Sequence, residues 1–137
     1  MNLKEINKFN DNTLMSHLGI EITEITENTV SGKMPVNSKT KQPMGLLHGG
    51  ASAALIESLG SVGSAISVDL KTQFIVGLEI NTNHIRGVKS GFVYCKATCI
   101  HKGRSTHIWS ADITNENSKL VATGRLTVLV KDIPLTK

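Results

Sequence analysis

The sequence has few aromatic residues for its length. Phenylalanine, tyrosine and tryptophan make up 4% of the 137 residues, and charged residues make up 19%. Because proteins that bind single-stranded nucleic acids stack the bases on aromatic side chains, this composition argues against a nucleic-acid partner. The formal net charge of +4 still leaves room for a smaller anionic ligand.

Cysteine is also scarce, with Cys95 and Cys99 the two present. They fall in a strand-like stretch, where residues four apart are separated by about 13 Å, which is too far for a disulfide. Neither has a partner at metal-ligand spacing, so we expect no zinc site and a reducing compartment. The first five residues lack the layout of a signal peptide, and we therefore expect a cytoplasmic location.

One long segment is nearly free of charge. Residues 42–68 carry a single formally charged side chain over 27 positions, which resembles a membrane span by length. The segment also holds five glycines and several serines, so it is too polar for lipid, and we predict a buried helix and no membrane partner. An apolar content of 39% is enough for a core, and the length fits a single domain over residues 1–137.

The periodicity of the chain predicts an α+β fold. Two short helical patterns occupy the first eighteen residues, and a β-hairpin covers residues 20–36. After a loop, a long helix is expected over residues 49–68, followed by strands at residues 74–86, 92–101, 105–114 and 119–130. The natural arrangement is a long central helix wrapped by a curved antiparallel sheet.

The two faces of the predicted long helix differ. An apolar stripe should face the sheet, namely Leu55, Leu59, Val62 and Ile66. The opposite face is built from small residues around one carboxylate, namely Gly50, Ala53, Ala54, Glu57, Gly60, Ser61 and Ser64. A solvated helix face is normally rich in long charged side chains, so this face predicts a closely packed second surface, most simply another copy of the chain.

Two features of this helix could carry chemistry. Glu57 would be poorly solvated on the small-residue face, which suits a nucleophile or general base, although an ordinary surface glutamate is the alternative. His48, Gly49 and Gly50 open the helix, where first-turn N–H groups left unpaired could bind a developing oxyanion. A tight junction between loop and helix would explain the same glycines.

The spacing of these features is more informative than either alone. His48 and Glu57 are nine residues apart, which on a helix means a rise of about 13 Å and a turn of about 180°. If both act on one substrate, they must come from different subunits. Gln42 could donate an amide hydrogen bond from the preceding loop. His84 ends an alternation of Val76, Leu78, Ile80 and Thr82 that we expect to point inward.

Three segments in this order resemble a known family. Residues 41–50 (KQPMGLLHGG), 57–61 (ESLGS) and 77–86 (GLEINTNHIR) are similar to motifs of the hotdog-fold acyl-CoA thioesterases. The branch is the one that contains 4-hydroxybenzoyl-CoA and 1,4-dihydroxy-2-naphthoyl-CoA thioesterases and the proofreading thioesterase of aryl carrier proteins. The resemblance extends from about residue 14 to residue 130.

The resemblance implies a homodimer with shared active sites, assembled into a dimer of dimers, and a reaction without metal or cofactor. In that scheme the Gly49 N–H polarises the thioester carbonyl, while Gln42 and His48 orient it. Glu57 of the other subunit attacks or activates water. The remaining matched positions, which would place the carboxylate, water or acyl group, are Ser61 and His84.

A basic stretch adds an expectation about coenzyme A. No acidic residue lies between Glu79 and Asp112, while five basic ones do. These charges could meet the phosphates of coenzyme A, or they could form a solvated basic edge that discourages aggregation. The predicted contacts are Arg86, Lys102, Gly103, Arg104 and Ser105.

We therefore predict hydrolysis of an aryl-acyl-CoA thioester, with 1,4-dihydroxy-2-naphthoyl-CoA of a menaquinone or phylloquinone pathway as the leading substrate. The alternatives are a proofreading thioesterase acting on misacylated aryl carrier protein and an acyl-CoA-binding protein without hydrolytic activity. The complete set of Gln42, His48, Gly49 and Glu57 argues against the latter.

Overall fold

The computed structural model describes residues 2–134, which form three helices and one six-stranded sheet. The helices are α1 (Leu3–Phe9), α2 (Leu14–Leu18) and α3 (Gly49–Ala65). The strands are β1 (Glu21–Ile25), β2 (Thr29–Pro35), β3 (Gln73–His84), β4 (Phe92–Lys102), β5 (Thr106–Asn115) and β6 (Leu120–Asp132). Every neighbouring pair in the order β1-β2-β4-β5-β6-β3 is antiparallel.

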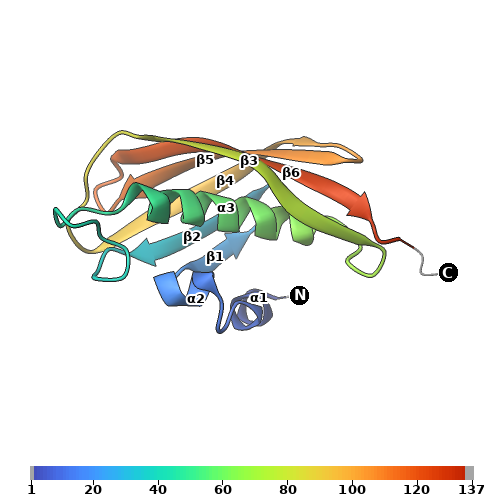
Figure 1. Cartoon of the computed structure of the whole chain (residues 1–137), viewed down its shortest axis with the longest axis horizontal. Coiled ribbons are helices and arrows are strands. Elements are labelled where there is room, and N and C mark those ends of the chain that lie inside the picture. The colour runs from blue at the N-terminus through green and yellow to red at the C-terminus, as the bar shows by residue number, and fades with distance from the viewer. Residues whose placement is uncertain (1, 135–137) are drawn as a thin grey trace.

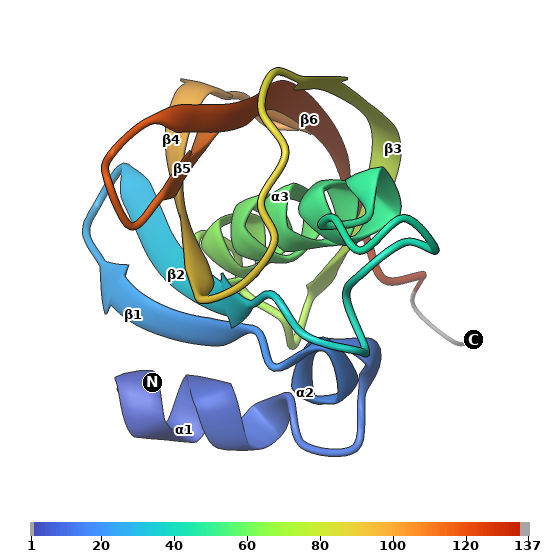
Figure 2. The same cartoon turned by 90° about the vertical axis from the view of Figure 1, so that its left-hand side faces the viewer.

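The sheet curls around α3, while α1 and α2 lie outside it next to β1 (Figures 1 and 2). The predicted α+β class, with a long helix wrapped by a curved antiparallel sheet as in the hotdog fold, is confirmed. Within the described part of the chain, no helix combines the length and apolar character needed to cross a membrane.

Strand β3 does not pair with the strand that follows it in the sequence. It pairs with β6, from Gln73 opposite Asp132 to His84 opposite Ala122, and so lies at an edge of the sheet. The connection over residues 85–91 therefore crosses in front of the N-terminal end of α3 to reach β4 (Figure 2). This crossing brings the end of β3 close to the start of the helix.

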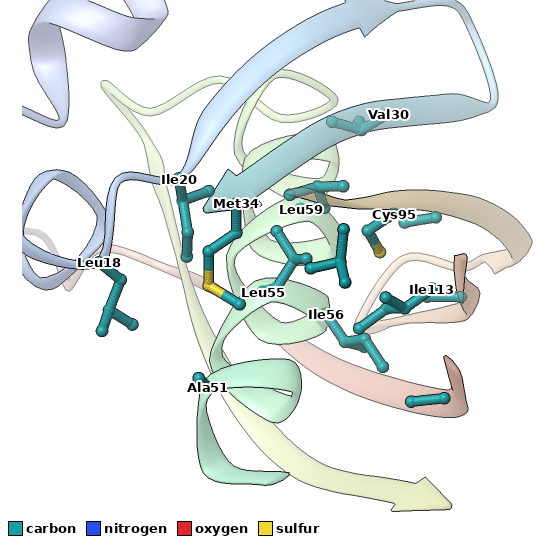
Figure 3. Packing of buried hydrophobic residues seen from close by; sticks show 14 of the residues in the cluster. Leu18, Ile20, Val30, Met34, Ala51, Leu55, Ile56, Leu59, Cys95 and Ile113 are labelled. Atoms are coloured by element: carbon teal, nitrogen blue, oxygen red, sulfur yellow. The ribbon is translucent and has the colours of Figure 1, made fainter. Parts of the chain in front are cut away.

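The core lies between α3 and the concave face of the sheet. Leu55, Ile56 and Leu59 of α3 have no exposed surface, and they pack among side chains of β2, β4 and β5 (Figure 3). Met34 and Ile113 are equally buried. Burial of such side chains stabilises the fold by roughly 1.5–3 kcal/mol each, and this packing fixes the rotation of α3 about its axis.

The small-residue face of α3 is smaller than predicted. The buried indole of Trp109 on β5 packs against the helix, and its Nε1–H donates to Ser64 Oγ at 2.8 Å. A Cβ on Gly60 would lie 3.3 Å from Trp109 Cγ, so Gly60 also faces the sheet. The prediction that placed Gly60 and Ser64 on the opposite face is wrong, because Ser64 bonds to the indole and Gly60 leaves room for Leu126 and Trp109.

The end of α3 and the phase of β3 also differ from prediction. The helix ends at Ala65, and Ile66 is 42% exposed instead of facing the sheet. In β3 the pairing register shifts between Gly77 and Glu79. This bulge turns Val76 and Leu78 outward, at 45% and 60% exposure, whereas sequence alternation predicted both to point inward.

Candidate active site

Glu57 lies half-buried in the middle of α3, on the face turned away from the core. Burial raises the pKa of its carboxyl group, and the hydroxyl of Ser61, one helical turn further on, offsets part of the rise. Both residues line a cavity of about 660 Å³. A poorly hydrated carboxylate at a cavity wall is suited to act as a nucleophile or a general base.

The Glu57 carboxylate lies against the backbone of β3. A Cβ on Gly77 would overlap Oε1 of Glu57 and would lie 3.3 Å from its Cδ. Gly77 has no positive φ, so its backbone does not require glycine. The glycine is needed here for space, because it lets the carboxylate approach the strand at the bulge.

The first turn of α3 leaves one N–H group free. His48 is the N-cap, and its Nδ1 accepts the N–H of Gly50 at 2.8 Å, while its carbonyl accepts the N–H of Ala51 at 3.0 Å. Among residues 2–134, nothing accepts the N–H of Gly49. The expected set of unpaired N–H groups is therefore reduced to a single donor at the positive end of the helix.

The cap also fixes the histidine tautomer. Because Nδ1 of His48 accepts a hydrogen bond, the proton of the neutral ring sits on Nε2. His48 is an exposed residue, so its ring has an N–H donor on Nε2 at the start of the helix. Two donors at one helix terminus could bind the same carbonyl oxygen.

Gln42 and His84 approach this helix terminus from other elements. A Cβ on Gly49 would lie 2.7 Å from Nε2 of His84, so the imidazole rests directly on the first helical residue. Gln42, Gly49, His84 and Arg86 share a cavity of about 300 Å³. The Oε1 of Gln42 accepts the N–H of Met44, which leaves the amide NH₂ as the part of Gln42 able to donate to a ligand.

One chain does not assemble the whole predicted set. The cavity beside Glu57 and the cavity beside Gly49 have no lining residue in common. The two residues are eight positions apart on α3, a rise of about 12 Å. The structure thus places Glu57 and Ser61 in one group and Gln42, Gly49 and His84 in another, with His48 capping the helix beside the second group.

The predicted coenzyme A contacts are also divided. Arg86 belongs to the cavity beside Gly49. The turn of residues 102–105, which holds Lys102, Gly103, Arg104 and Ser105, lies at the other end of the sheet (Figure 1). Lys102 pairs with His107 of β5, and His107 pairs with Val128 of β6. His84 pairs with Ala122 of β6. These two positions on β6 are six residues apart, so the two groups are separated by about 20 Å along the strand. In one chain these groups cannot meet the same phosphate.

Sequence reasoning missed Gly77 and the cavity walls formed by α1 and α2. A glycine inside a strand pattern was the available signal for Gly77, since it often marks a bulge or a close backbone approach. In the part of the chain that the structure describes, no three His, Cys, Asp or Glu side chains are grouped to hold a metal ion.

Comparison with known proteins gives consistent matches. The model of the thioesterase superfamily matches residues 44–122. The 1,4-dihydroxy-2-naphthoyl-CoA hydrolase of Escherichia coli is 38% identical over 93% of this chain and 93% of its own length. A thioesterase from Haemophilus influenzae has a TM-score of 0.92 and 42% identity, covering 96% of this chain and 92% of its own. A thioesterase variant from Pseudomonas aeruginosa has a TM-score of 0.94 and 41% identity, and the match covers 97% of this chain and 96% of the variant.

Proposed function

This chain belongs to the thioesterase superfamily and is a thioester hydrolase acting on acyl-CoA, and from this premise we propose that its substrate is an aryl-acyl-CoA. The proposed leading substrate is 1,4-dihydroxy-2-naphthoyl-CoA, supported by the similarity to the Escherichia coli hydrolase. The observation that carries the mechanism is the pair of groups on α3, a half-buried carboxylate at Glu57 and, within residues 2–134, an unpaired N–H at Gly49.

The proposed chemistry needs no cofactor. The Glu57 carboxylate attacks the thioester carbonyl carbon, or it removes a proton from the water that attacks it. The carbonyl oxygen becomes negative and accepts the N–H of Gly49 and the Nε2–H of His48 from the partner subunit, each worth about 3 kcal/mol when well placed. The C–S bond then breaks, and the coenzyme A sulfur leaves and takes up a proton from Glu57 or from solvent. When Glu57 is the general base, the free acid is released at this step. When Glu57 is the nucleophile, water then hydrolyses the mixed anhydride, which releases the acid and restores the carboxylate. Gln42 and His84 beside Gly49 position the acyl carbonyl.

We propose a homodimer because one chain holds the two halves of the site apart. The β3 edge supports this assembly, since it leaves backbone groups unpaired and exposes Val76 and Leu78. An apolar, unprotected edge strand is a template for pairing with another strand. In the dimer, Glu57 of one copy would meet Gly49 of the other, and two such dimers would form the tetramer.

A thiol-release assay tests the proposed activity. The panel contains aryl-CoA, fatty-acyl-CoA and aryl-carrier-protein thioesters, so that the carrier-protein alternative is measured alongside. Aryl-CoA substrates are expected to give the highest kcat/KM, and Glu57→Gln to lower kcat by about 10²–10⁴-fold while the oligomer persists. Near-normal turnover by this variant would contradict the assigned role, and preference for a carrier-protein thioester would reassign the substrate.

A mixing experiment tests the shared site. Glu57→Gln and Gly49→Pro homodimers should both be inactive, the second because proline has no N–H to donate. Exchange of subunits between the two should restore one intact site per heterodimer. If the heterodimer forms, as native mass spectrometry can verify, and stays inactive, the two-subunit arrangement is refuted.

Arg86 is the proposed phosphate contact closest to the reacting groups, because it lines the same cavity as Gly49. Arg86→Ala is expected to raise KM for acyl-CoA with little change in kcat, and to make KM less sensitive to salt. Arg104→Ala tests the turn of residues 102–105 in the same way, because that turn cannot reach the cavity beside Gly49 within one chain. If both variants leave KM unchanged, neither Arg86 nor Arg104 contributes to coenzyme A binding.

A further inference from the structure

The N-terminal helices enclose one side of the larger cavity. It lies between α1, α2, the outward face of α3 and the segment that leads from α3 to β3. Its volume of about 660 Å³ is within the usual range of roughly 300–1,000 Å³ for small-molecule sites. Apolar side chains from all of these elements form its wall, among them Phe9, Met15, Val62, Ile66, Leu70 and Ile75.

The cavity runs along α3 away from the reacting carboxylate. Glu57, Ser61 and Ala65 all line it and follow one another at four-residue spacing, which places them on one helix face over about 12 Å. A group bonded to a carbonyl carbon at Glu57 would therefore extend past Ser61 toward Ala65. This direction is open to a multi-carbon group, whereas a two-carbon acyl group would stay near Glu57.

Phe9 is placed at this cavity without serving the fold. Phe9 is 79% exposed, although α1 itself is attached to β1 by the following contacts. The Asn7 side chain donates to the carbonyl of Ile22 at 2.8 Å and accepts its N–H at 2.9 Å, and Ile6 is buried beneath the helix. Since α1 is held by these contacts, an exposed aromatic ring at the cavity is free to pack on a ligand.

We propose that α1 and α2 form the acyl-binding wall of the site, and that Phe9 selects for aromatic acyl groups. This inference rests on the proposed thioester hydrolysis and adds to it the element that recognises the acyl part. A flat ring bound here would stack on or against the edge of Phe9 and contact the apolar wall. An acyl group would cover Phe9 and bury its apolar surface only when the group is large enough to reach α1, so a small acyl group would gain nothing from Phe9.

Binding to an inactive protein tests this proposal separately from catalysis. With Glu57→Gln as background, calorimetry compares the Kd of benzoyl-CoA with that of coenzyme A. We expect the benzoyl group to tighten binding, and Phe9→Ala to remove roughly tenfold or more of that gain without changing the Kd of coenzyme A. The matched control is Leu14→Ala, which removes an apolar side chain that is 64% exposed on α2 and does not line the cavity.

Two further measurements, the kinetics of an Ala65 variant and the oligomeric state of Phe9→Ala, also test the proposal. Ala65→Phe fills the far end of the cavity and should lower kcat/KM for 1,4-dihydroxy-2-naphthoyl-CoA by a larger factor than kcat/KM for acetyl-CoA, and equal losses with the two substrates would count against the proposal. An unchanged benzoyl gain in Phe9→Ala, or equal losses in Phe9→Ala and Leu14→Ala, would overturn the proposal. A shift of Phe9→Ala to a smaller oligomer would overturn it too, by making Phe9 an interface residue. Loss of catalysis alone bears on the proposed function, because the binding comparison does not depend on turnover.

Discussion

Replacing Gly77 by alanine should disable the site without unfolding the protein. The added methyl group would occupy the place of Glu57 Oε1, the end of a flexible side chain, and the backbone at residue 77 has no positive φ. Alanine therefore fits β3, and replacing glycine at a compatible position typically stabilises a protein by about 0.4–1 kcal/mol. The carboxylate has to move instead of the strand.

The size of the effect follows from the displacement. Non-bonded atoms pack at about 3.5 Å or more, so the oxygen has to shift by on the order of 1 Å or rotate away. A misplacement of about 1 Å in a reacting group can cost about 100-fold in rate. We expect Gly77→Ala to lower kcat by this amount with an unchanged KM and an equal or higher Tm.

A double-mutant cycle with Glu57→Asp provides the decisive assay. Aspartate is one methylene shorter and withdraws the carboxylate from residue 77, so Gly77→Ala should cost far less in that background than in the parent. Thiol release gives kcat for the four proteins, and thermal unfolding gives their stabilities. Additive losses, or a loss of kcat that follows a fall in Tm, would refute the steric argument.

Three other expectations concern ionisation and packing. Because the proposed mechanism uses the ionised carboxylate of Glu57 and burial raises its pKa, kcat/KM should fall as the pH drops through a value above that of an ordinary glutamate, and Ser61→Ala should move this limb to higher pH in a pH-rate profile. Ser64→Ala leaves the buried Trp109 N–H without its acceptor and should cost about 1–3 kcal/mol in urea unfolding. Burial and the nearby Asp112 raise the pKa of Cys95 to about 12, so iodoacetamide at pH 8 should leave it unmodified in the native protein, as mass spectrometry can verify; rapid alkylation would contradict its burial.

Local pattern was enough to predict most elements of this fold. The strands at residues 92–101, 105–114 and 119–130 were expected within two residues of β4, β5 and β6. Alternation of apolar residues marks the strands, and short polar or glycine-containing segments separate them. Strand order could not be obtained in this way, because the pairing of β3 with β6 depends on contacts between residues about 50 positions apart.

The wrong details share a physical origin in tertiary packing. A single bulge at Gly77 reverses the phase of β3, and strict alternation cannot detect an inserted residue. Gly60 and Ser64 lie on the sheet side of α3 next to Trp109, although the helix sequence alone places them on the opposite, small-residue face. In both cases the deciding partner is distant in the sequence.

The candidate site also has a part that local sequence predicts and a part that depends on distant contacts. Gln42, Gly49, Glu57 and His84 were predicted from motifs, and helix geometry alone indicated that Glu57 and the helix start cannot meet in one chain. The acyl-side cavity was beyond prediction, because its walls come from α1, α2, α3 and the start of β3. Phe9 has no motif around it, and its position becomes informative only when α1 is seen beside the exposed face of α3.

The small residues of α3 have two different structural roles, because some pack against the sheet and others face the cavity beside Glu57. Gly63 leaves room for the Trp109 ring, Gly60 leaves room for Leu126, and Ser64 accepts the indole N–H, so that together they fix the rotation of the helix against the sheet. That rotation turns Glu57 and Ser61 toward the cavity and sets the carboxylate against Gly77. A substitution at Gly60 should therefore harm stability and carboxylate position together, whereas a substitution at Gly77 should change the carboxylate alone. The packing of α3 against the sheet thus sets the position of the half-buried Glu57 carboxylate.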